Sequence, residues 1–323
     1  MTSYHDLLLG AYAMAPDPAA EDAFYDGIAK VGIGGLEMPL PLSGARTLDP
    51  AWIARHVRPE WDVLMTCIPT VMARLGSDVR YGLAATDDDA RSRAVADVGR
   101  ARDLALRLAD LSGRRRVTAI QVHGAPDPER GSRAALARSL AEIAEWDLAG
   151  AEILVEHCDA AIPGQAAAKG FLSLDDEIAA VLEVMGTAPG PVGMSVNWGR
   201  SAIEGRRAAT AIEHVTAVAE AGLLRVVVLS GATDAHTLWG PAWSDAHIPP
   251  RGDDPALAAS AASLLGPDEI AATFRAAGPG PQVVVKVSVR PADADVATRV
   301  AVARAALAEV AAARSSVPAR PAG

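Results

Sequence analysis

The chain has 323 residues, half of them hydrophobic and only 4% aromatic, with a formal net charge of −10 at neutral pH. One large domain or two average ones fit this length, and a barrel of eight strand–helix units takes about 250 residues or more. An acidic chain repels phosphate backbones and anionic membranes, so we expect neither nucleic acid nor a membrane surface as a partner.

Cysteine use and the N-terminal residues predict the compartment. The two cysteines, Cys67 and Cys158, are too few for a disulfide framework, which favours a reducing environment. The first ten residues, MTSYHDLLLG, lack the basic-then-apolar order of a signal peptide. No apolar run approaches the ~20 residues that a membrane span needs. We therefore expect a cytoplasmic protein, and the sequence leaves its oligomeric state open, a homo-oligomer included.

Short runs rich in β-branched residues recur eight times, and segments with helical periodicity separate most of them. The predicted strands are, in chain order, Leu7–Ala13, Gly35–Leu40, Asp62–Ile68, Val117–His123, Ile153–His157, Gly193–Asn197, Val226–Ser230 and Val283–Val289. The predicted helices are Pro18–Val31, Asp87–Leu111, Ser132–Trp146, Leu174–Met185, Ala208–Ala221, Pro267–Ala277 and Asp293–Arg314, with a short connection at Asp49–Val57.

This alternation allows a closed barrel or an open doubly wound sheet. Strands such as Val226–Ser230 and Val283–Val289 are apolar on both faces, as parallel strands covered by helices must be. The residues after the first strand, GAYAMAPDP, lack the glycine fingerprint of a dinucleotide-binding sheet. Eight units favour the barrel, so we predict an α/β fold, a single (β/α)8 TIM barrel over residues 1–314, with a flexible tail at 315–323.

Two predicted loops exceed the usual length of 2–6 residues. One runs from Pro69 to about Ala85, and the other runs from Gly231 to Gly266; both follow strand ends. The second contains residues that favour an ordered structure and ligand contacts, namely Trp239, Trp243, Asp245 and His247. We interpret this loop as a lid over the mouth of the barrel.

Polar residues occur late in five predicted strands, on the face that points to the barrel axis. They are His123, Glu156, Asn197, Ser230 and Lys286. Active sites of TIM barrels lie at the C-terminal ends of the strands, so these side chains form the predicted site.

Lys286 carries the strongest signal because the chain has three lysines, Lys30, Lys169 and Lys286, among 30 basic residues. A buried ammonium costs several kcal/mol unless it is paired, and arginine does not replace a compact, titratable amine freely. A salt bridge from Lys286 to Glu156 or Glu37 that only closes the barrel is the alternative. Glu156, a carboxylate after three apolar strand residues, is the other main catalytic candidate.

Other candidates are weaker. His123 is a second acid or base, or else a hydrogen-bonded core histidine; Glu37 ends a strand and is placed to contact a ligand hydroxyl. Arg200, three residues past Asn197, is a candidate anchor for a carboxylate or phosphate. We expect His157 to point into the strand–helix layer. His5, His56 and His214 lie outside the strand ends and are discounted.

The strand ends GLEMP, QVHG, LVEH, SVNWG, LSG and VKVS resemble those of the xylose isomerase-like barrels. That superfamily contains sugar isomerases, epimerases and endonuclease-type hydrolases. The blocks LVEHCDA, SVNWGRSAIEGR and WSDAHIPP are similar to an uncharacterised bacterial family placed in this superfamily. The resemblance spans nearly the whole chain.

The resemblance implies a divalent metal held by an acid, an acid, a histidine and an acid from four late strands. Glu156 matches the first acid, but Asn197, Ser230 and Lys286 stand in the other three places. An ammonium repels a cation and donates no lone pair, so the sequence does not predict the family's metal unless Asp245 and His247 join Glu156. Lys286 is then expected to act electrostatically in its place.

We therefore predict a sugar or sugar-acid isomerase or epimerase that works by proton transfer next to a carbonyl. Glu156 is its predicted base, Lys286 its electrostatic stabiliser and His123 a second acid or base. The substrate-binding residues are Glu37, Asn197, Arg200, Ser230, Trp239, Trp243, Asp245 and His247. Alternatives are a Schiff-base lyase or aldolase using Lys286, a metal-dependent hydrolase, and a non-catalytic sugar-binding barrel.

Overall fold

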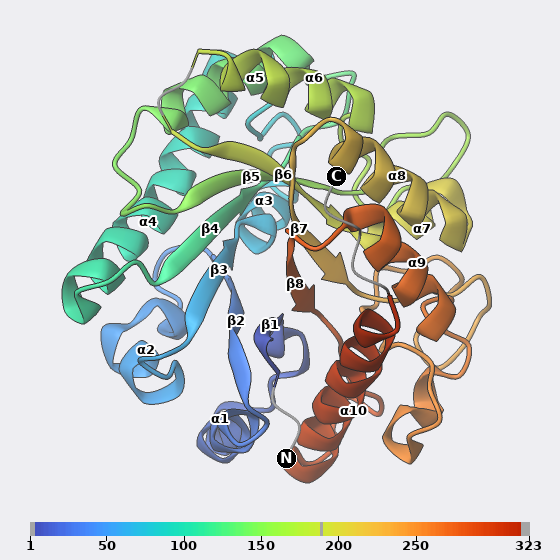
Figure 1. The fold of residues 1–323 in the computed structure, drawn as a ribbon. Coiled ribbons are helices and arrows are strands. Elements are labelled where there is room, and N and C mark those ends of the chain that lie inside the picture. The colour runs from blue at the N-terminus through green and yellow to red at the C-terminus, as the bar shows by residue number, and fades with distance from the viewer. Residues whose placement is uncertain (1–3, 188–189, 318–323) are drawn as a thin grey trace.

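The computed structural model describes residues 4–187 and 190–317. Within them, eight parallel strands form a closed barrel in sequence order, and β8 pairs with β1 to close it (Figure 1). The strands are β1 (Tyr4–Leu9), β2 (Ile33–Pro39), β3 (Asp62–Thr66), β4 (Val117–Val122), β5 (Glu152–His157), β6 (Val192–Asn197), β7 (Leu224–Leu229) and β8 (Gln282–Val285).

Helices surround the barrel and cover the outer face of the sheet (Figure 1). They are α1 (Glu21–Ala29), α2 (Pro50–His56), α3 (Ile68–Leu75), α4 (Asp88–Ser112), α5 (Arg133–Ala144), α6 (Leu174–Met185), α7 (Trp198–Gly205), α8 (Ala208–Glu220), α9 (Pro267–Ala277) and α10 (Val296–Ser315). The predicted (β/α)8 TIM barrel is therefore confirmed.

Several predicted strands, the one at Asp62–Ile68 included, are too long at their C-terminal ends, and the first and the last exceed the observed strands most. β1 ends at Leu9, and a 3-10 turn at residues 11–14 replaces the rest of the predicted run. β8 ends at Val285, although the backbone N–H of Lys286 still donates to the carbonyl of Leu229 on the neighbouring strand β7. Two residues on, Ser288 donates its N–H to His247 instead, because the loop after β7 folds back along this segment.

Two helices were missed. The predicted loop from Pro69 to Ala85 begins with α3, whose Pro69 occupies the first turn, where a missing N–H costs nothing. α7 follows β6 directly because Asn197 caps it, accepting a hydrogen bond from the N–H of Arg200. The first predicted helix opens as a 3-10 turn at residues 18–20, before α1.

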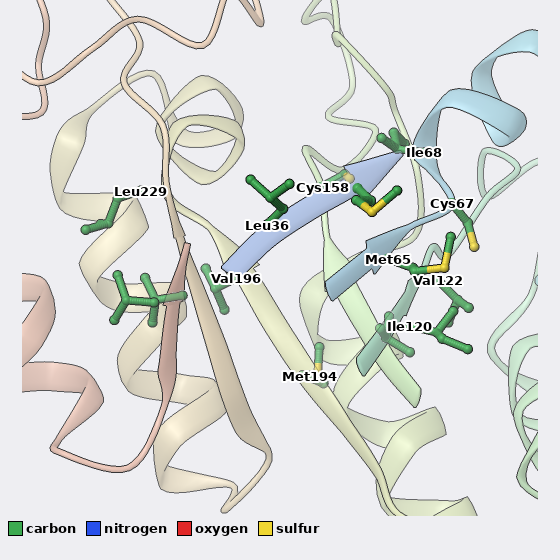
Figure 2. Packing of buried hydrophobic residues seen from close by; sticks show 14 of the residues in the cluster. Leu36, Met65, Cys67, Ile68, Ile120, Val122, Cys158, Met194, Val196 and Leu229 are labelled. Carbon is green, nitrogen blue, oxygen red and sulfur yellow. The ribbon is translucent and has the colours of Figure 1, made fainter. Parts of the chain in front are cut away.

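The core has two layers, one on each face of the sheet. The barrel interior contains Leu8, Leu64, Ala119, Leu154, Val226, Val228 and Val284. Side chains such as Met65, Ile120, Val122, Met194 and Val196 belong to the main cluster, which packs between strands and helices (Figure 2). Because residues two apart in a strand share one face, Glu156 points into the barrel as Leu154 does, and Lys286 points into it as Val284 does.

The loop from Gly231 to Gly266 is ordered. It contains a 3-10 helix at Pro255–Ser260, and Gly231 pairs with Ile248 in an antiparallel bridge. At the other end of the chain, α10 includes Ser315, and most of the tail predicted at 315–323 lies outside the described residues. Among the helices of the described ranges, none combines the length and the apolar character needed to cross a membrane.

Candidate active site

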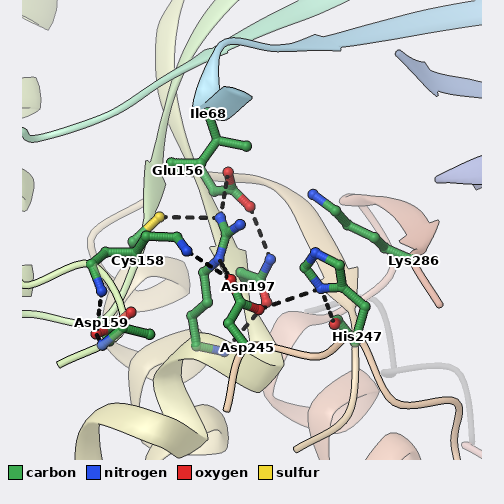
Figure 3. Close-up of polar contacts among 12 residues, drawn as sticks. Ile68, Glu156, Cys158, Asp159, Asn197, Asp245, His247 and Lys286 are labelled. Carbon is green, nitrogen blue, oxygen red and sulfur yellow. Dashed lines mark hydrogen bonds and ion pairs between the residues drawn. The ribbon is translucent and has the colours of Figure 1, made fainter. Parts of the chain in front are cut away.

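The five polar strand-end residues of the prediction converge at the C-terminal mouth of the barrel, and all are at most 1% exposed. They are His123, Glu156, Asn197, Ser230 and Lys286. Figure 3 shows Glu156, Asn197 and Lys286 among them. Burial of this many polar groups is stable only where each finds partners. The contacts divide them into two groups, one around Glu156 and one around Lys286.

Glu156 on β5 is the centre of the first group. Its Oε2 accepts a hydrogen bond from His123 Nε2 at 2.7 Å and pairs with Arg200 Nη1 at 3.1 Å. Its Oε1 accepts from Asn197 Nδ2 at 3.0 Å. Both carboxylate oxygens are therefore engaged by neighbouring side chains.

Arg200 reaches the mouth because α7 starts directly at the end of β6. Its Nη1 also lies 3.2 Å from Cys158 Sγ, and its Nε lies 3.2 Å from Asp245 Oδ2. Lys169, from the loop after β5, pairs with the same Asp245 oxygen at 3.1 Å. The guanidinium predicted to anchor a ligand's anion thus contacts the protein's own acids.

Asp245 and His247 come from the long loop after β7 and lie over the mouth (Figure 3). His247 Nδ1 is 3.4 Å from Asp245 Oδ1 and 2.9 Å from Ser230 Oγ. Ser288 Oγ donates to the backbone oxygen of Ala246 at 2.6 Å, which fastens the loop to the segment after β8. This part of the loop therefore covers the mouth, as the lid prediction requires.

Lys286 forms the second group. Its Nζ is 3.0 Å from Glu37 Oε1, so of the two acids named as alternatives it pairs with Glu37 and not with Glu156. The ammonium also lies 5.1 Å from the centre of the Tyr12 ring, within cation–π range. Gly10 allows this approach: a β-carbon there would lie 2.7 Å from Glu37 Oε2 and 2.9 Å from Lys286 Cγ.

The electrostatics of the mouth fix the ionisation of its groups. Burial raises the pKa of Glu156, but Arg200, His123 and Lys286 outweigh it and hold this pKa well below its usual value. Burial lowers the pKa of His123, and burial near cationic side chains lowers the pKa of His247 to about 3. Both histidines are therefore neutral at pH 7, beside an ionised Glu156.

Burial lowers the pKa of Lys286, but the carboxylate of Glu37 outweighs it and raises this pKa, so the ammonium is held charged. The mouth then contains three carboxylates and three cations, since Glu37, Glu156 and Asp245 face Lys286, Arg200 and Lys169. This balance allows the cluster to be buried.

Three buried polar atoms near these residues have no hydrogen-bond partner within the described ranges. They are Glu37 Oε2, His123 Nδ1 and Gln121 Oε1. Gln121 lies two residues before His123 on β4, and its Nε2 donates to Ser195 Oγ at 3.0 Å. Unsatisfied buried groups are costly, so these atoms are candidates for ligand contacts.

The mouth does not fit the divalent metal of the xylose isomerase-like barrels. One atom each from His123, Glu156 and Cys158 lie within 4.8 Å of one another, a spacing that could hold an ion. Arg200 Nη1, however, contacts two of those atoms, so a guanidinium already takes the cation's position. Asp245 is likewise paired with two cationic side chains, those of Lys169 and Arg200. Asp245 and His247 therefore do not complete a metal site with Glu156.

Sequence reasoning missed Tyr12, Cys158 and Lys169. The signal that identified Lys286, a lysine in an arginine-rich chain, applies equally to Lys169 and could have found it. Trp239 and Trp243 were predicted to bind substrate, but the contacts they make are with other residues than the polar ones at the mouth. Trp239 donates to Ala259 and stacks under Arg290, and Trp243 lies beneath Arg206.

Comparison with known proteins places the chain in a family. Residues 8–302 match the family described as Domain of unknown function (DUF4862). A protein of Salmonella typhimurium LT2, named Uncharacterized protein STM3670, is 34% identical over 255 residues, which cover 75% of this chain and 77% of that protein.

Solved structures share the fold at low sequence identity. A xylose isomerase domain containing protein from Salmonella typhimurium LT2 is 10% identical with a TM-score of 0.60, over 96% of this chain and 99% of its own. A D-psicose 3-epimerase, crystallised with D-fructose, is 13% identical with a TM-score of 0.56, over 94% and 96% of the two chains. These likenesses show that the chain has the xylose isomerase-like barrel fold.

Proposed function

The chain belongs to the DUF4862 family and has the xylose isomerase-like barrel fold, and from that premise we propose that it is a sugar or sugar-acid isomerase or epimerase. Its substrate is a small polyhydroxylated carbonyl compound, and the reaction moves a proton at the carbon next to the carbonyl. One observation carries the proposal: a buried base, an acid and an amide at the mouth each keep one polar atom without a partner.

His123 is the proton acceptor in this proposal, and Glu156 positions it. An ionised Glu156 can only accept, so His123 Nε2 carries the proton of their 2.7 Å hydrogen bond and Nδ1 keeps its lone pair. Both oxygens of Glu156 are engaged, whereas Nδ1 of His123 has no hydrogen-bond partner in the described part of the chain. A carboxylate that orients a histidine base is a recurrent catalytic arrangement.

The proton leaves the substrate carbon for His123 Nδ1, and its bonding electrons form an enediolate. The negative charge collects on the former carbonyl oxygen, and the ammonium of Lys286 stabilises it. Glu37, the partner of Lys286, accepts a hydrogen bond from a substrate hydroxyl through Oε2, which has no partner among the described residues. Return of the proton to the neighbouring carbon, together with transfer of the remaining hydroxyl proton to the former carbonyl oxygen, gives the isomer. Return of the proton to the other face of the same carbon gives the epimer. A metal ion supplies no step in this scheme.

The substrate reaches these groups only when the covering segments move, because His123, Lys286 and Glu37 are at most 1% exposed. The loop bearing Asp245 and His247, and the loop bearing Lys169, are the two segments that cover them. Movement of such loops on binding is common in barrel enzymes.

The test measures wash-in of deuterium by NMR. The full chain, treated with EDTA, is incubated in D2O with a panel of aldoses, ketoses and sugar acids. We expect exchange at the carbon next to the carbonyl of at least one compound. The His123→Gln variant should lose about 10²-fold or more of this rate, as expected for loss of a general base.

The matched control is His236→Gln, which removes an exposed histidine of the loop after β7 and should keep the wild-type rate. A His123→Gln variant that exchanges as fast as wild type would overturn the assignment of the base. So would trapping of Lys286 by borohydride, which indicates a Schiff base.

A further inference from the structure

A second polar cluster lies outside the barrel, between β5 and helices α6, α7 and α8. It contains two histidines and two acids: His157, the neighbour of Glu156 on β5, with Glu177 of α6, Glu204 of α7 and His214 of α8. His157 and Glu177 are fully buried, and the side chains of Glu204 and His214 are 12% and 13% exposed. The mechanism proposed for the mouth does not use any of them.

We propose that His157, Glu204 and His214 bind one divalent transition-metal ion, with zinc the best match to the ligand set. Two imidazoles and one carboxylate are a set that zinc proteins use, whereas calcium and magnesium prefer oxygen ligands. The site takes its ligands from three different elements, so the ion would join β5 to both helices.

The spacing of the ligand atoms supports this. His157 Nε2 is 3.1 Å from Glu204 Oε2, and His214 Nε2 is 3.7 Å from Glu204 Oε1. One donor atom from each residue can be chosen so that all three lie within 4.8 Å of one another. Ligands about 2.0–2.1 Å from a tetrahedral zinc are about 3.3 Å apart, close to these distances.

Glu177 completes the arrangement. Its Oε2 is 2.7 Å from His157 Nδ1, the ring nitrogen that a metal at Nε2 would leave to carry a proton. Histidine ligands of metals usually donate this second N–H to a carboxylate, which fixes the tautomer and the ring orientation. Among the residues that the structure describes, the other oxygen of Glu177 is buried without a hydrogen-bond partner, as is Nδ1 of His214.

The cluster also lacks the feature that argues against a metal at the mouth. Among the described residues, no lysine or arginine forms an ion pair with Glu177 or Glu204. The facing atoms of His157, Glu204 and His214 are therefore not held by a fixed cation within the described ranges.

A metal bound here would stabilise two segments that contribute residues to the candidate active site. Glu204 Oε2 accepts a hydrogen bond from the N–H of Ala160 at 2.7 Å, in the loop that carries Lys169. α7 contains both Glu204 and Arg200, one turn apart, so an ion at Glu204 fixes the helix that positions Arg200. Its role is therefore structural, and no substrate contact is implied.

The test titrates ZnCl2 by calorimetry into the full chain after treatment with EDTA and dialysis. We expect one zinc per chain and a higher midpoint of thermal unfolding with zinc. His214→Gln and Glu204→Gln should lose this binding, and Glu177→Gln should weaken it about 10–100-fold. His236→Gln, at an exposed histidine, is the matched control and should bind as wild type does.

Cobalt separates this site from the mouth. A cobalt complex of the wild type should show a tetrahedral d–d spectrum without thiolate-to-cobalt absorption, and Cys158→Ser should leave it unchanged. The proposal is overturned if the wild type binds no zinc stoichiometrically, which leaves a proton-bridged cluster only. It is equally overturned if His214→Gln and Glu204→Gln keep wild-type affinity, or if Cys158→Ser abolishes binding.

Discussion

Two adjacent residues of β5, Glu156 and His157, belong to two polar clusters that differ in the source of their positive charge. Glu156 points into the barrel, where three carboxylates are balanced by three cationic side chains and the histidines are neutral. His157 points outward, where two carboxylates face two histidines and, among the described residues, neither acid forms an ion pair with a lysine or arginine. Strand alternation alone separates the two environments.

The difference shows that the kind of positive charge decides what a buried acid can do. At the mouth, fixed ammonium and guanidinium groups exclude a metal and hold Glu156 ionised beside a neutral histidine. Outside, the two acids face imidazoles and, within the described ranges, no fixed cation, so a metal ion can supply the positive charge there. The following substitutions test this comparison, from the largest expected effect to the smallest.

Lys286→Met should have the largest effect on stability. It removes the ammonium and leaves the Glu37 carboxylate buried without a counter-charge. Breaking a buried pair in this way costs about 3–5 kcal/mol in the free energy of unfolding. Urea unfolding followed by circular dichroism measures it.

Two variants control this result. Glu37→Gln combined with Lys286→Met removes both charges of this pair and should recover most of the loss. Lys30→Met removes an exposed lysine and should change stability by less than about 0.5 kcal/mol. Equal losses for Lys286→Met and Lys30→Met would show that the mouth is not a network of dependent charges.

His247→Asn tests the neutral histidines of the mouth. Burial and nearby Lys286, Arg200 and Lys169 lower the pKa of His247 to about 3, although Asp245 opposes this. The unfolded chain takes up a proton near pH 6.5 and the folded chain does not, so stability falls as pH falls from 6.5 toward 3. The limiting slope is about 1.4 kcal/mol per pH unit.

Asparagine tolerates the left-handed backbone of His247, whose φ is 50°, so the variant keeps the loop conformation. We expect its stability between pH 6.5 and 5 to depend less on pH than that of the wild type. The side chain is 18% exposed, so the difference should stay below the limiting slope. An unchanged pH dependence in urea unfolding would mean that His247 is not held neutral.

Much of the fold and part of the site could be predicted from the sequence. Inward and outward faces follow from strand periodicity, which placed Glu156 at the mouth and His157 in the outer layer. The lid residues Asp245 and His247 followed from the length and composition of one loop. These features depend on local pattern, which a sequence contains.

The pairings could not be predicted. Lys286 meets Glu37 because β8 closes against β1 and because Gly10 has no side chain between them. Lys169 comes from a loop whose path no local periodicity defines, and His214 was discounted because it lies in a helix away from strand ends. Contacts across the barrel depend on closure and on loop paths, which are tertiary properties.

Glu177→Gln should have a moderate effect in metal-free protein. The amide oxygen can still accept the hydrogen bond of His157 Nδ1, so no donor is stranded, but a charge-assisted bond becomes a neutral one. We expect a loss of about 1–2 kcal/mol in the free energy of unfolding, smaller than for Lys286→Met. A loss as large as that of Lys286→Met would indicate that the outer cluster depends on fixed charge as the mouth does.

Arg207→Gln should have the smallest effect and sets the baseline for both clusters. Arg207, which directly precedes α8, pairs with Glu213 of α8 at 2.8 Å, and both side chains are more than half exposed. Glu213 is the residue before His214 in the sequence. Water and salt screen such a pair, so its loss should change the free energy of unfolding by less than about 0.5 kcal/mol in urea titrations. Because Glu213 and His214 are neighbours on one helix, exposure is the main difference between this pair and the outer cluster. If Arg207→Gln and Glu177→Gln lowered the free energy of unfolding by the same amount, burial would not explain the contribution of the outer cluster to stability. The comparison of the two faces of β5 would then be wrong.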